Sequence, residues 1–343
     1  MPSVSLRQIA EQAGCTRATV CYALQNASNV SVETKRRVHA IAERMGWRPN
    51  AELSRQMALT RSTLKDSLRC NIALVIQKPA KELESDPIPR RQFRGAIERA
   101  GQLGFNGNVF NLAEEALSPR RLRAIFHSRN VQGVVFVATV GSSFSRDYLN
   151  VGKDFATSVA AVRYPEVGYH VAITDFLANG LIACQAMREA GFKRIGAMMP
   201  KAVEEPLDYN FSAGLVGGYL KHYGKADLPI IYGASEKIRL VPEDRPAIFR
   251  WINTHKFDAV LTSDHYHFAE YIQDYPGRKP RIFSLNYHTG ALGAEGGVDQ
   301  LYELAGAAAV DLVVAQLHRG ERGEPGSQKS IQIAGKWIWP RKR

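Results

Sequence analysis

The first part of the chain has its apolar residues at helical spacing. Over 6–13 they recur every three or four positions, and Gly14 then offers the left-handed conformation that ends a helix. Thr16 can cap a second helix, whose apolar stripe runs from Val20 to Leu24. The pattern predicts a helix, a tight turn and a second helix.

A third helix is predicted after a short polar stretch. Ser31 is a natural N-cap, the apolar positions between 38 and 45 share one face, and Gly46 stops the helix. Three helices of this size can close a small core. The second helix turns its polar side outward near its start, as the recognition helix of a helix-turn-helix does toward base edges. The outward residues are Arg17, Ala18, Cys21 and Tyr22.

From Asn71 onward, short apolar runs alternate with helical patterns, which is typical of βα units around a parallel sheet. The first series has predicted strands over 71–77, 108–112, 131–139 and 158–163, with helices over 90–104 and 118–129. The second has strands over 170–175, 193–200, 228–233, 257–264 and 281–286, with helices over 178–191, 208–223 and 246–256. A long helix over 301–320 and a last strand over 330–340 return to one half or the other. Two similar α/β halves are expected.

Composition and charge bear on the partner. A chain of 343 residues is long enough for a small domain plus a larger, divided one. Residues 1–69 hold eleven Lys and Arg against five Asp and Glu, so one fifth of the chain carries half of the net charge of +12. A basic N-terminal domain favours a polyanionic partner, although a solvated basic face has the same composition.

Other sequence features bear on compartment and cofactors. No apolar run reaches the ~18 residues of a membrane helix, and the N-terminus lacks a secretory signal pattern, so we expect a cytoplasmic protein. The four cysteines have no metal-binding spacing and indicate free thiols. We expect neither a metal nor a cofactor.

Signals for catalysis are weak. The run 263–267 places Ser, Asp and His together, but adjacent side chains point apart and cannot form a relay. His265, His267 and Glu270 lack a recognisable zinc spacing, and the glycine-rich run 290–297 lacks a phosphate-loop context. No catalytic residue is predicted.

Residues 4–50, which include "VSLRQIAEQAG" and "TRATVCYALQN", closely resemble the DNA-binding domain of the lactose-repressor-type (LacI/GalR) regulators. The resemblance implies a helix-turn-helix over 1–49 that reads the major groove of a pseudo-palindromic operator. Arg17, Ala18 and Tyr22 match base-reading positions, and Tyr22 stands where arginine is usual. The matching backbone-contact positions are Ser5, Thr16, Thr19, Ser31 and Thr34. Since tyrosine cannot grip guanine with two hydrogen bonds, an unusual operator is expected.

Residues 50–69 match the hinge of that family, a short helix that folds on DNA and wedges a leucine into the minor groove. Gln56 occupies the leucine position here, so Leu53 or Met57 is expected to serve instead, with Met57 preferred. A plain polar linker is the alternative.

The remainder, 70–343, resembles the family's effector core: two doubly wound parallel-sheet lobes of periplasmic-binding-protein type with a ligand cleft between them. Lobe 1 is expected over about 70–163 plus 287–320, and lobe 2 over about 164–286 plus 321–343. Ligands of such folds bind at the carboxyl ends of strands. The effector-binding candidates are Gln77, Arg163, Tyr164, Asp175, Phe211, Asp264, Asn286 and Tyr287.

The effector positions also depart from the family. Leu215 occupies the place of an arginine, and Asn286 replaces an aspartate. An unusual sugar, a non-sugar ligand or no ligand at all would be consistent with these losses.

The resemblance implies a transcriptional regulator, by default a repressor, that acts as a homodimer on operator DNA under allosteric control by a small molecule. The chain's end is too short for a tetramerising coiled coil, which favours a dimer over a tetramer. The alternative is a small-molecule (sugar) binding protein, or an enzyme on the same core, without specific DNA binding.

Overall fold

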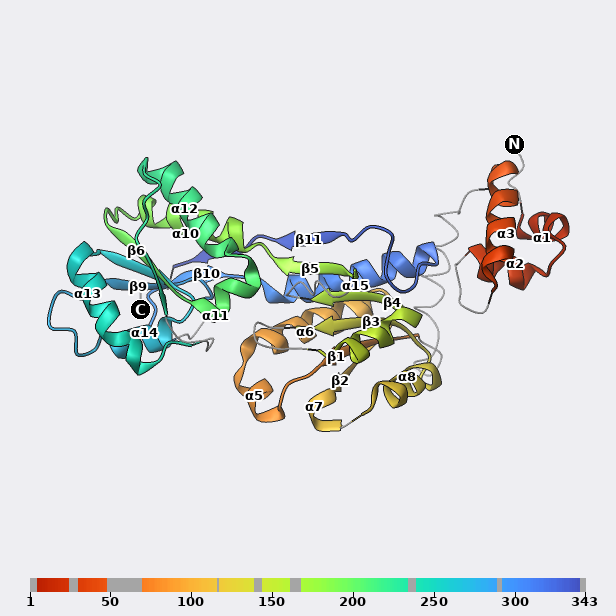
Figure 1. Ribbon diagram of the computed structural model, residues 1–343, viewed down its shortest axis with the longest axis horizontal. Coiled ribbons are helices and arrows are strands. Elements are labelled where there is room, and N and C mark those ends of the chain that lie inside the picture. The colour runs from red at the N-terminus through yellow and green to blue at the C-terminus, as the bar shows by residue number, and fades with distance from the viewer. Residues whose placement is uncertain are drawn as a thin grey trace. The chain divides into compact units, whose positions relative to one another are not determined.

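The computed structural model describes residues 5–24, 30–47, 70–115, 117–138, 144–160, 168–233, 239–288 and 292–339. Its elements are labelled in Figure 1. Within these ranges, every helix is too short or too polar to cross a membrane.

The N-terminal domain is a bundle of three helices with its own core. The helices are α1 (Leu6–Ala13), α2 (Arg17–Leu24) and α3 (Val32–Arg44). The residues buried among them are Ile9, Ala10, Ala13, Val20, Ala23, Val38, Ile41 and Ala42. The helical stripes predicted from the sequence therefore meet in one small core, and the predicted three-helix domain is confirmed.

Side-chain caps set the boundaries of these helices. Ser5 and Gln8 form a reciprocal capping box at the start of α1, and Gly14 ends that helix with φ of 62°. Thr16 Oγ1 accepts from the Thr19 backbone N–H at 3.1 Å and so caps α2. Ser31 Oγ accepts from the Thr34 N–H at 3.2 Å and caps α3.

Replacing Ser31 with alanine is expected to destabilise the three-helix domain by about 0.5–2 kcal/mol, because a backbone N–H at the start of α3 loses its acceptor. Ser31→Asn is the control, since asparagine caps a helix equally well. Hydrogen exchange of the α3 amides in the full chain measures the difference. Equal protection in the alanine and asparagine variants would show that the hydroxyl does not stabilise the helix.

The first α/β unit is built on a six-stranded sheet in the order β11-β5-β4-β3-β1-β2. Its strands are β1 (Asn71–Ile76), β2 (Asn106–Asn111), β3 (Val131–Val137), β4 (Ala156–Ala160), β5 (His170–Thr174) and β11 (Ser330–Ile333). Its helices are α5 (Ala80–Ser85), α6 (Pro87–Gln102), α7 (Leu112–Glu115), α8 (Pro119–Ser128), α9 (Arg146–Leu149) and α15 (Tyr302–Arg319). Strands β1 to β5 pair in parallel, so their first residues share one edge of the sheet.

The second α/β unit has a six-stranded sheet in the order β12-β10-β9-β8-β6-β7. Its strands are β6 (Ile195–Pro200), β7 (Ile230–Gly233), β8 (Ala259–Thr262), β9 (Arg281–Ser284), β10 (Gly297–Asp299) and β12 (Lys336–Ile338). Its helices are α10 (Phe176–Glu189), α11 (Lys201–Glu204), α12 (Asn210–Tyr223), α13 (Arg245–His255) and α14 (His265–Tyr271). Strand β12 runs antiparallel to β10, and the described pairs among β6 to β10 are parallel.

Two strand assignments from the sequence were wrong. Strand β5, expected to open the second half, pairs with β4 in the first sheet through Ser158 and His170. The last strand does not return to a single half, because β11 joins the first sheet and β12 the second. An apolar run predicts a strand but does not select its partner.

The lobe boundaries also differ from the expected ones. Residues 287–302 belong to the second unit and 321–331 to the first. Tyr287 explains the first shift, since its N–H donates to the Val298 carbonyl beside β10. Lys329 explains the second, because its carbonyl accepts from the Val171 N–H of β5.

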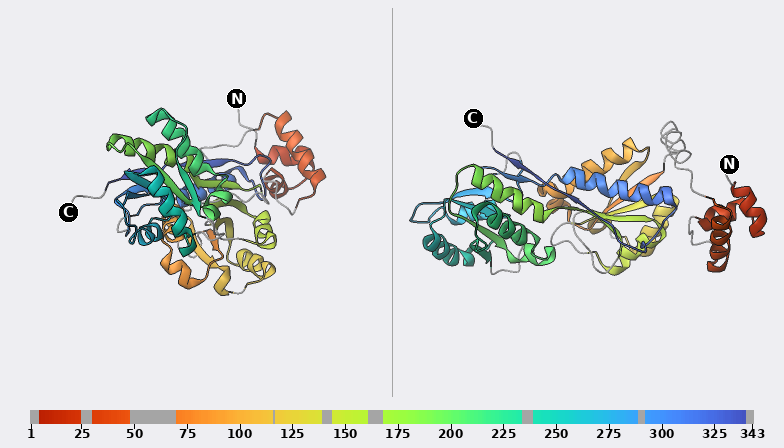
Figure 2. Two further views of the ribbon diagram at one scale, coloured as in Figure 1. Left: turned by 60° about the vertical axis from the view of Figure 1, so that its left-hand side comes forward. Right: turned by 90° about the horizontal axis from the view of Figure 1, so that it is seen from above.

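Each unit contains a pair of helices whose backbones touch through glycines. A Cβ at Gly214 of α12 would lie 2.1 Å from the Leu177 carbonyl oxygen of α10. A Cβ at Gly306 of α15 would lie 2.1 Å from the Gln92 carbonyl oxygen of α6, and Figure 2 shows these two helices side by side. Only glycine permits such close packing of the helices that cover the sheets.

Candidate DNA-binding and effector sites

The start of α2 presents an exposed surface suited to base contacts. Arg17 and Ala18 are exposed in its first turn, and Tyr22, one turn later, is 46% exposed. No acidic residue lies in the first turn of α1 or α2. The structure therefore brings the three expected base-reading residues to one exposed helix face, while the side chain of Cys21 lies outside the described residues.

The expected backbone-contact residues all lie at helix N-termini. Thr16 and Thr19 hydroxyls are 2.8 Å apart, and those of Ser31 and Thr34 are 2.9 Å apart. When Thr19 donates to Thr16, the Thr16 O–H is left to donate outward. A helix start with an extra hydroxyl donor suits a phosphate. The capping bonds show that these residues also stabilise the domain.

The same domain carries further basic residues on α1 and α3. Among the described residues, Arg7 pairs with Glu11 at 3.3 Å and Arg44 donates to Gln12 at 3.3 Å. Arg36 and Arg37 are exposed on α3. Such flexible cations supply sequence-independent attraction to a phosphate backbone.

Four of the predicted site residues lie outside the described residues. They are Leu53 and Met57 of the expected hinge, and Arg163 and Tyr164 of the expected effector site. Their roles remain predictions from the sequence.

Asp264 and Asn286 follow the adjacent strands β8 and β9, so the second sheet brings them to the same carboxyl edge. Both have intramolecular partners. Asp264 Oδ2 accepts from the Leu240 N–H at 2.7 Å, and its Oδ1 lies 2.8 Å from His267 Nδ1. Asn286 Oδ1 accepts from the Tyr302 hydroxyl at 3.2 Å. A ligand at this edge would compete with these bonds.

Gln77 and Asp175 follow β1 and β5 at the carboxyl edge of the first sheet. Gln77 is half-buried, and its buried Oε1 has no hydrogen-bond partner among the described residues. Asp175 caps α10, with Oδ1 accepting from the Ala178 N–H at 2.8 Å. Of the two, Gln77 has the free polar atom that a ligand could satisfy.

Two aromatic effector candidates, Phe211 and Tyr287, are core residues instead. Phe211 is 2% exposed and packs against Phe176, with ring centroids 4.8 Å apart. Tyr287 is 7% exposed. Burial of both rings leaves little face for a sugar, so this part of the sequence prediction does not hold in the structure.

A polar network that the sequence did not indicate lies between the ends of β6 and β7. The Glu204 carboxylate is fully buried, and its Oε2 accepts from the Ser212 N–H of α12 at 3.0 Å. The Tyr232 hydroxyl donates to Ser212 Oγ at 2.8 Å. Within the part of the chain that the structure describes, Glu204 Oε1 has no hydrogen-bond partner. A charged residue in the short helix after an apolar strand was the available signal, and it is a common one.

Burial raises the pKa of Glu204, and the hydrogen bonds from Ser212 oppose that effect. A carboxyl group whose pKa is higher in the folded chain makes folding less favourable as pH rises above its unfolded value of ~4.3. We therefore expect Glu204→Gln to reduce the loss of stability between pH 4 and pH 8. Urea denaturation at several pH values in this range measures the free energy of unfolding of the parent protein and the variant. Identical pH profiles for the two would contradict the raised pKa of Glu204.

The run 263–267 does not form a catalytic relay. His265 Nδ1 lies 2.9 Å from Ser284 Oγ, while Asp264 contacts His267 rather than His265. Ser284 is itself fully buried. Among the described residues, no three His, Cys, Asp or Glu side chains are grouped so that they could hold a metal ion.

Comparison with known proteins identifies the N-terminal segment and the fold. Residues 5–50 match the family model described as bacterial regulatory proteins, lacI family. The transcriptional regulator CelR, solved as a cellobiose complex, is similar at 18% identity over 98% of both chains, with a TM-score of 0.56. A search among curated proteins gave no match.

Two further solved structures have the same fold. The lac repressor dimer bound to operator and the anti-inducer ONPF is 15% identical over 98% of both chains, with a TM-score of 0.53. The trehalose repressor from Escherichia coli is 13% identical over 80% of this chain and all of its own, also with a TM-score of 0.53. At such identities, the likeness shows the fold alone. Together with the family match over residues 5–50, it gives this chain a segment similar to the lacI-family helix-turn-helix and the fold of these regulator structures.

Proposed function

We propose that the protein is a transcriptional regulator, by default a repressor, that binds a pseudo-palindromic operator as a homodimer. The observation that carries the proposal is the exposed face of α2, where Arg17, Ala18 and Tyr22 lie together. The hydroxyl of Thr16 caps the start of this helix. Two such domains would occupy half-sites about one helical turn, ~34–36 Å, apart. The solved lac repressor dimer on its operator supports this arrangement.

A small molecule is proposed to control DNA binding from the effector core. The fold supports this role, because the CelR structure of the same fold holds cellobiose. In this chain the free polar atom of Gln77 and the carboxyl-edge residues Asp264 and Asn286 are the candidates for ligand contacts. A neutral ligand with several hydroxyl groups would suit this set, because a hydroxyl can donate to the free Gln77 oxygen and to the oxygens of Asp264 and Asn286.

The proposal assigns no catalytic step. It is distinguished from a small-molecule binding protein, or an enzyme on the same core, by the salt dependence of DNA affinity. Fluorescence anisotropy with a labelled duplex should give an association constant that falls steeply and linearly with salt on logarithmic axes. A sugar-binding protein without DNA function would show no such binding at near-physiological salt.

The effector is tested through linkage. A saccharide that raises the melting temperature of the protein should also change its DNA affinity, by about 5- to 150-fold for a coupling of 1–3 kcal/mol. A saccharide that binds without any change in DNA affinity would contradict effector control, while leaving DNA binding itself intact.

A further inference from the structure

A cavity of about 320 Å³ lies in the first α/β unit, on the connection from α15 to β11. Its wall includes His170, the first residue of β5, so it lies at the edge where the parallel strands begin. Ligands of this fold class bind at the opposite, carboxyl edge. The cavity is therefore separate from the proposed effector residues, and its volume suits a small molecule.

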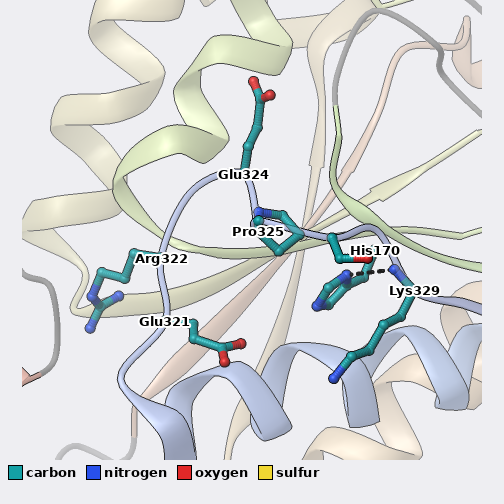
Figure 3. A pocket seen from close by; sticks show the side chains of 8 residues that line it. His170, Glu321, Arg322, Glu324, Pro325 and Lys329 are labelled. Atoms are coloured by element: carbon teal, nitrogen blue, oxygen red, sulfur yellow. Dashed lines mark hydrogen bonds between the residues drawn. The ribbon is translucent and has the colours of Figure 1, made fainter.

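The His170 ring supplies an unused hydrogen-bond donor at this cavity. The ring is 1% exposed, and Nδ1 accepts from the Lys329 backbone N–H at 3.1 Å. The ring hydrogen must then sit on Nε2, which is buried and has no partner in the described ranges. Figure 3 shows this nitrogen facing the space in front of Glu321. Burial, and then the Lys329 charge, lowers the pKa of His170, so the ring stays neutral.

The charges around the cavity leave a positive excess. Glu321 is neutralised by Arg319, whose Nε and Nη2 donate to its two oxygens at 2.6 and 2.7 Å. Arg322 donates only to uncharged oxygens of Gln132, at 3.1 and 3.2 Å. Among the described residues, Lys329 has no carboxylate partner.

The remaining acid does not cancel this excess. Glu324 lies 3.8 Å from the Lys153 ammonium, and in Figure 3 it points away from the other labelled side chains. The donors at the cavity are thus the Lys329 ammonium, the ring N–H of His170 and the guanidinium of Arg322, which is bonded to Gln132 and in Figure 3 points away from the other two. All three are donors, and two carry positive charge.

We propose that this cavity is a second ligand site, which takes a small anion bearing a phosphoryl or carboxylate group. Arg322 and Lys329 supply the charge that anions require, and charge-assisted hydrogen bonds are the strongest of the ordinary kinds. Glu321 would stay paired with Arg319 as the anion enters beside His170. The site lies on the segment that carries the chain from α15 into β11, so occupancy would stabilise that segment.

Equilibrium dialysis of the full-length protein against labelled inorganic phosphate, and separately against labelled malonate, tests the proposal. We expect at least one of the two anions to bind at one saturable site per chain. The anion that binds shows whether the site takes a phosphoryl or a carboxylate group. Lys329→Gln and Arg322→Gln should each weaken binding about tenfold or more. Both side chains are exposed, so neither change should disturb folding, which circular dichroism checks.

Two matched controls test whether loss of any exposed cation weakens anion binding. Lys221→Gln, at an exposed position of α12 in the second unit, should leave the dissociation constant unchanged. Arg36→Gln, in the three-helix domain, should also leave it unchanged. The proposal is overturned if neither anion saturates, or if the Lys329 and Arg322 variants bind like the controls. Neither failure would affect the proposed DNA-binding function.

Discussion

Arg17→Ala is expected to lower affinity for the preferred operator by about 5- to 150-fold, which corresponds to the 1–3 kcal/mol of one good side-chain contact to a base. Arg17 is exposed in the first turn of α2 and has no acidic residue beside it in that turn, so its guanidinium is free to reach a base edge. The loss should be confined to specific duplexes and should relax the preference at one position of each half-site. Anisotropy titrations on single-base variants of the operator measure both effects.

Arg7→Ala is the matched control for this change. Arg7 is an exposed arginine of the same domain, but it lies on α1 and pairs with Glu11. Its loss should weaken binding to all duplexes alike and leave the base preference intact. If the two variants lost affinity equally on specific and random duplexes, Arg17 would be a phosphate contact and the base-reading assignment would be wrong.

Gly214→Ala is expected to destabilise the second α/β unit by about 1–3 kcal/mol. The added methyl carbon would lie 2.1 Å from the Leu177 carbonyl oxygen and 2.8 Å from its carbonyl carbon. These are backbone atoms of α10, so α10 and α12 would have to separate. Chemical denaturation followed by circular dichroism measures the loss.

Gly101→Ala is the control, because its methyl group would have no heavy atom within 4 Å. Gly101 lies in α6, so alanine there should stabilise the chain by about 0.4–1 kcal/mol through the unfolded state. Opposite signs for the two glycine changes are the expected result. A neutral Gly214→Ala would mean that the helices do not pack as closely as described.

Features set by nearby residues were predictable from the sequence. The three helices of the N-terminal domain were predicted because apolar spacing and the caps at Ser5, Thr16 and Ser31 act within one or two turns. The βα alternation was likewise visible in local runs. The sheet to which β5 belongs was not predictable, nor was the division of the last strand between the two sheets. Strand pairing depends on which sheet edge, distant in sequence, is available.

The site residues show the same limit. Asn286 lies at a strand end, as the sequence predicted. Its side-chain oxygen, however, accepts a hydrogen bond from the Tyr302 hydroxyl of a later segment. Phe211 was an effector-binding candidate, yet it is buried and packs against Phe176. Glu204 was missed, because only the fold shows that its carboxylate is buried at the start of α12. Such roles depend on neighbours that spacing alone does not reveal.

Selection from a random duplex pool with the purified full-length protein, at near-physiological salt, tests the central claim most directly. The account predicts enrichment of a palindrome with two half-sites about one helical turn apart, and a changed base preference when the selection is repeated with Tyr22→Ala. Retention of DNA without any enriched sequence, by a protein whose three-helix domain is shown to be folded, would contradict the assignment of α2 as a reader of DNA sequence.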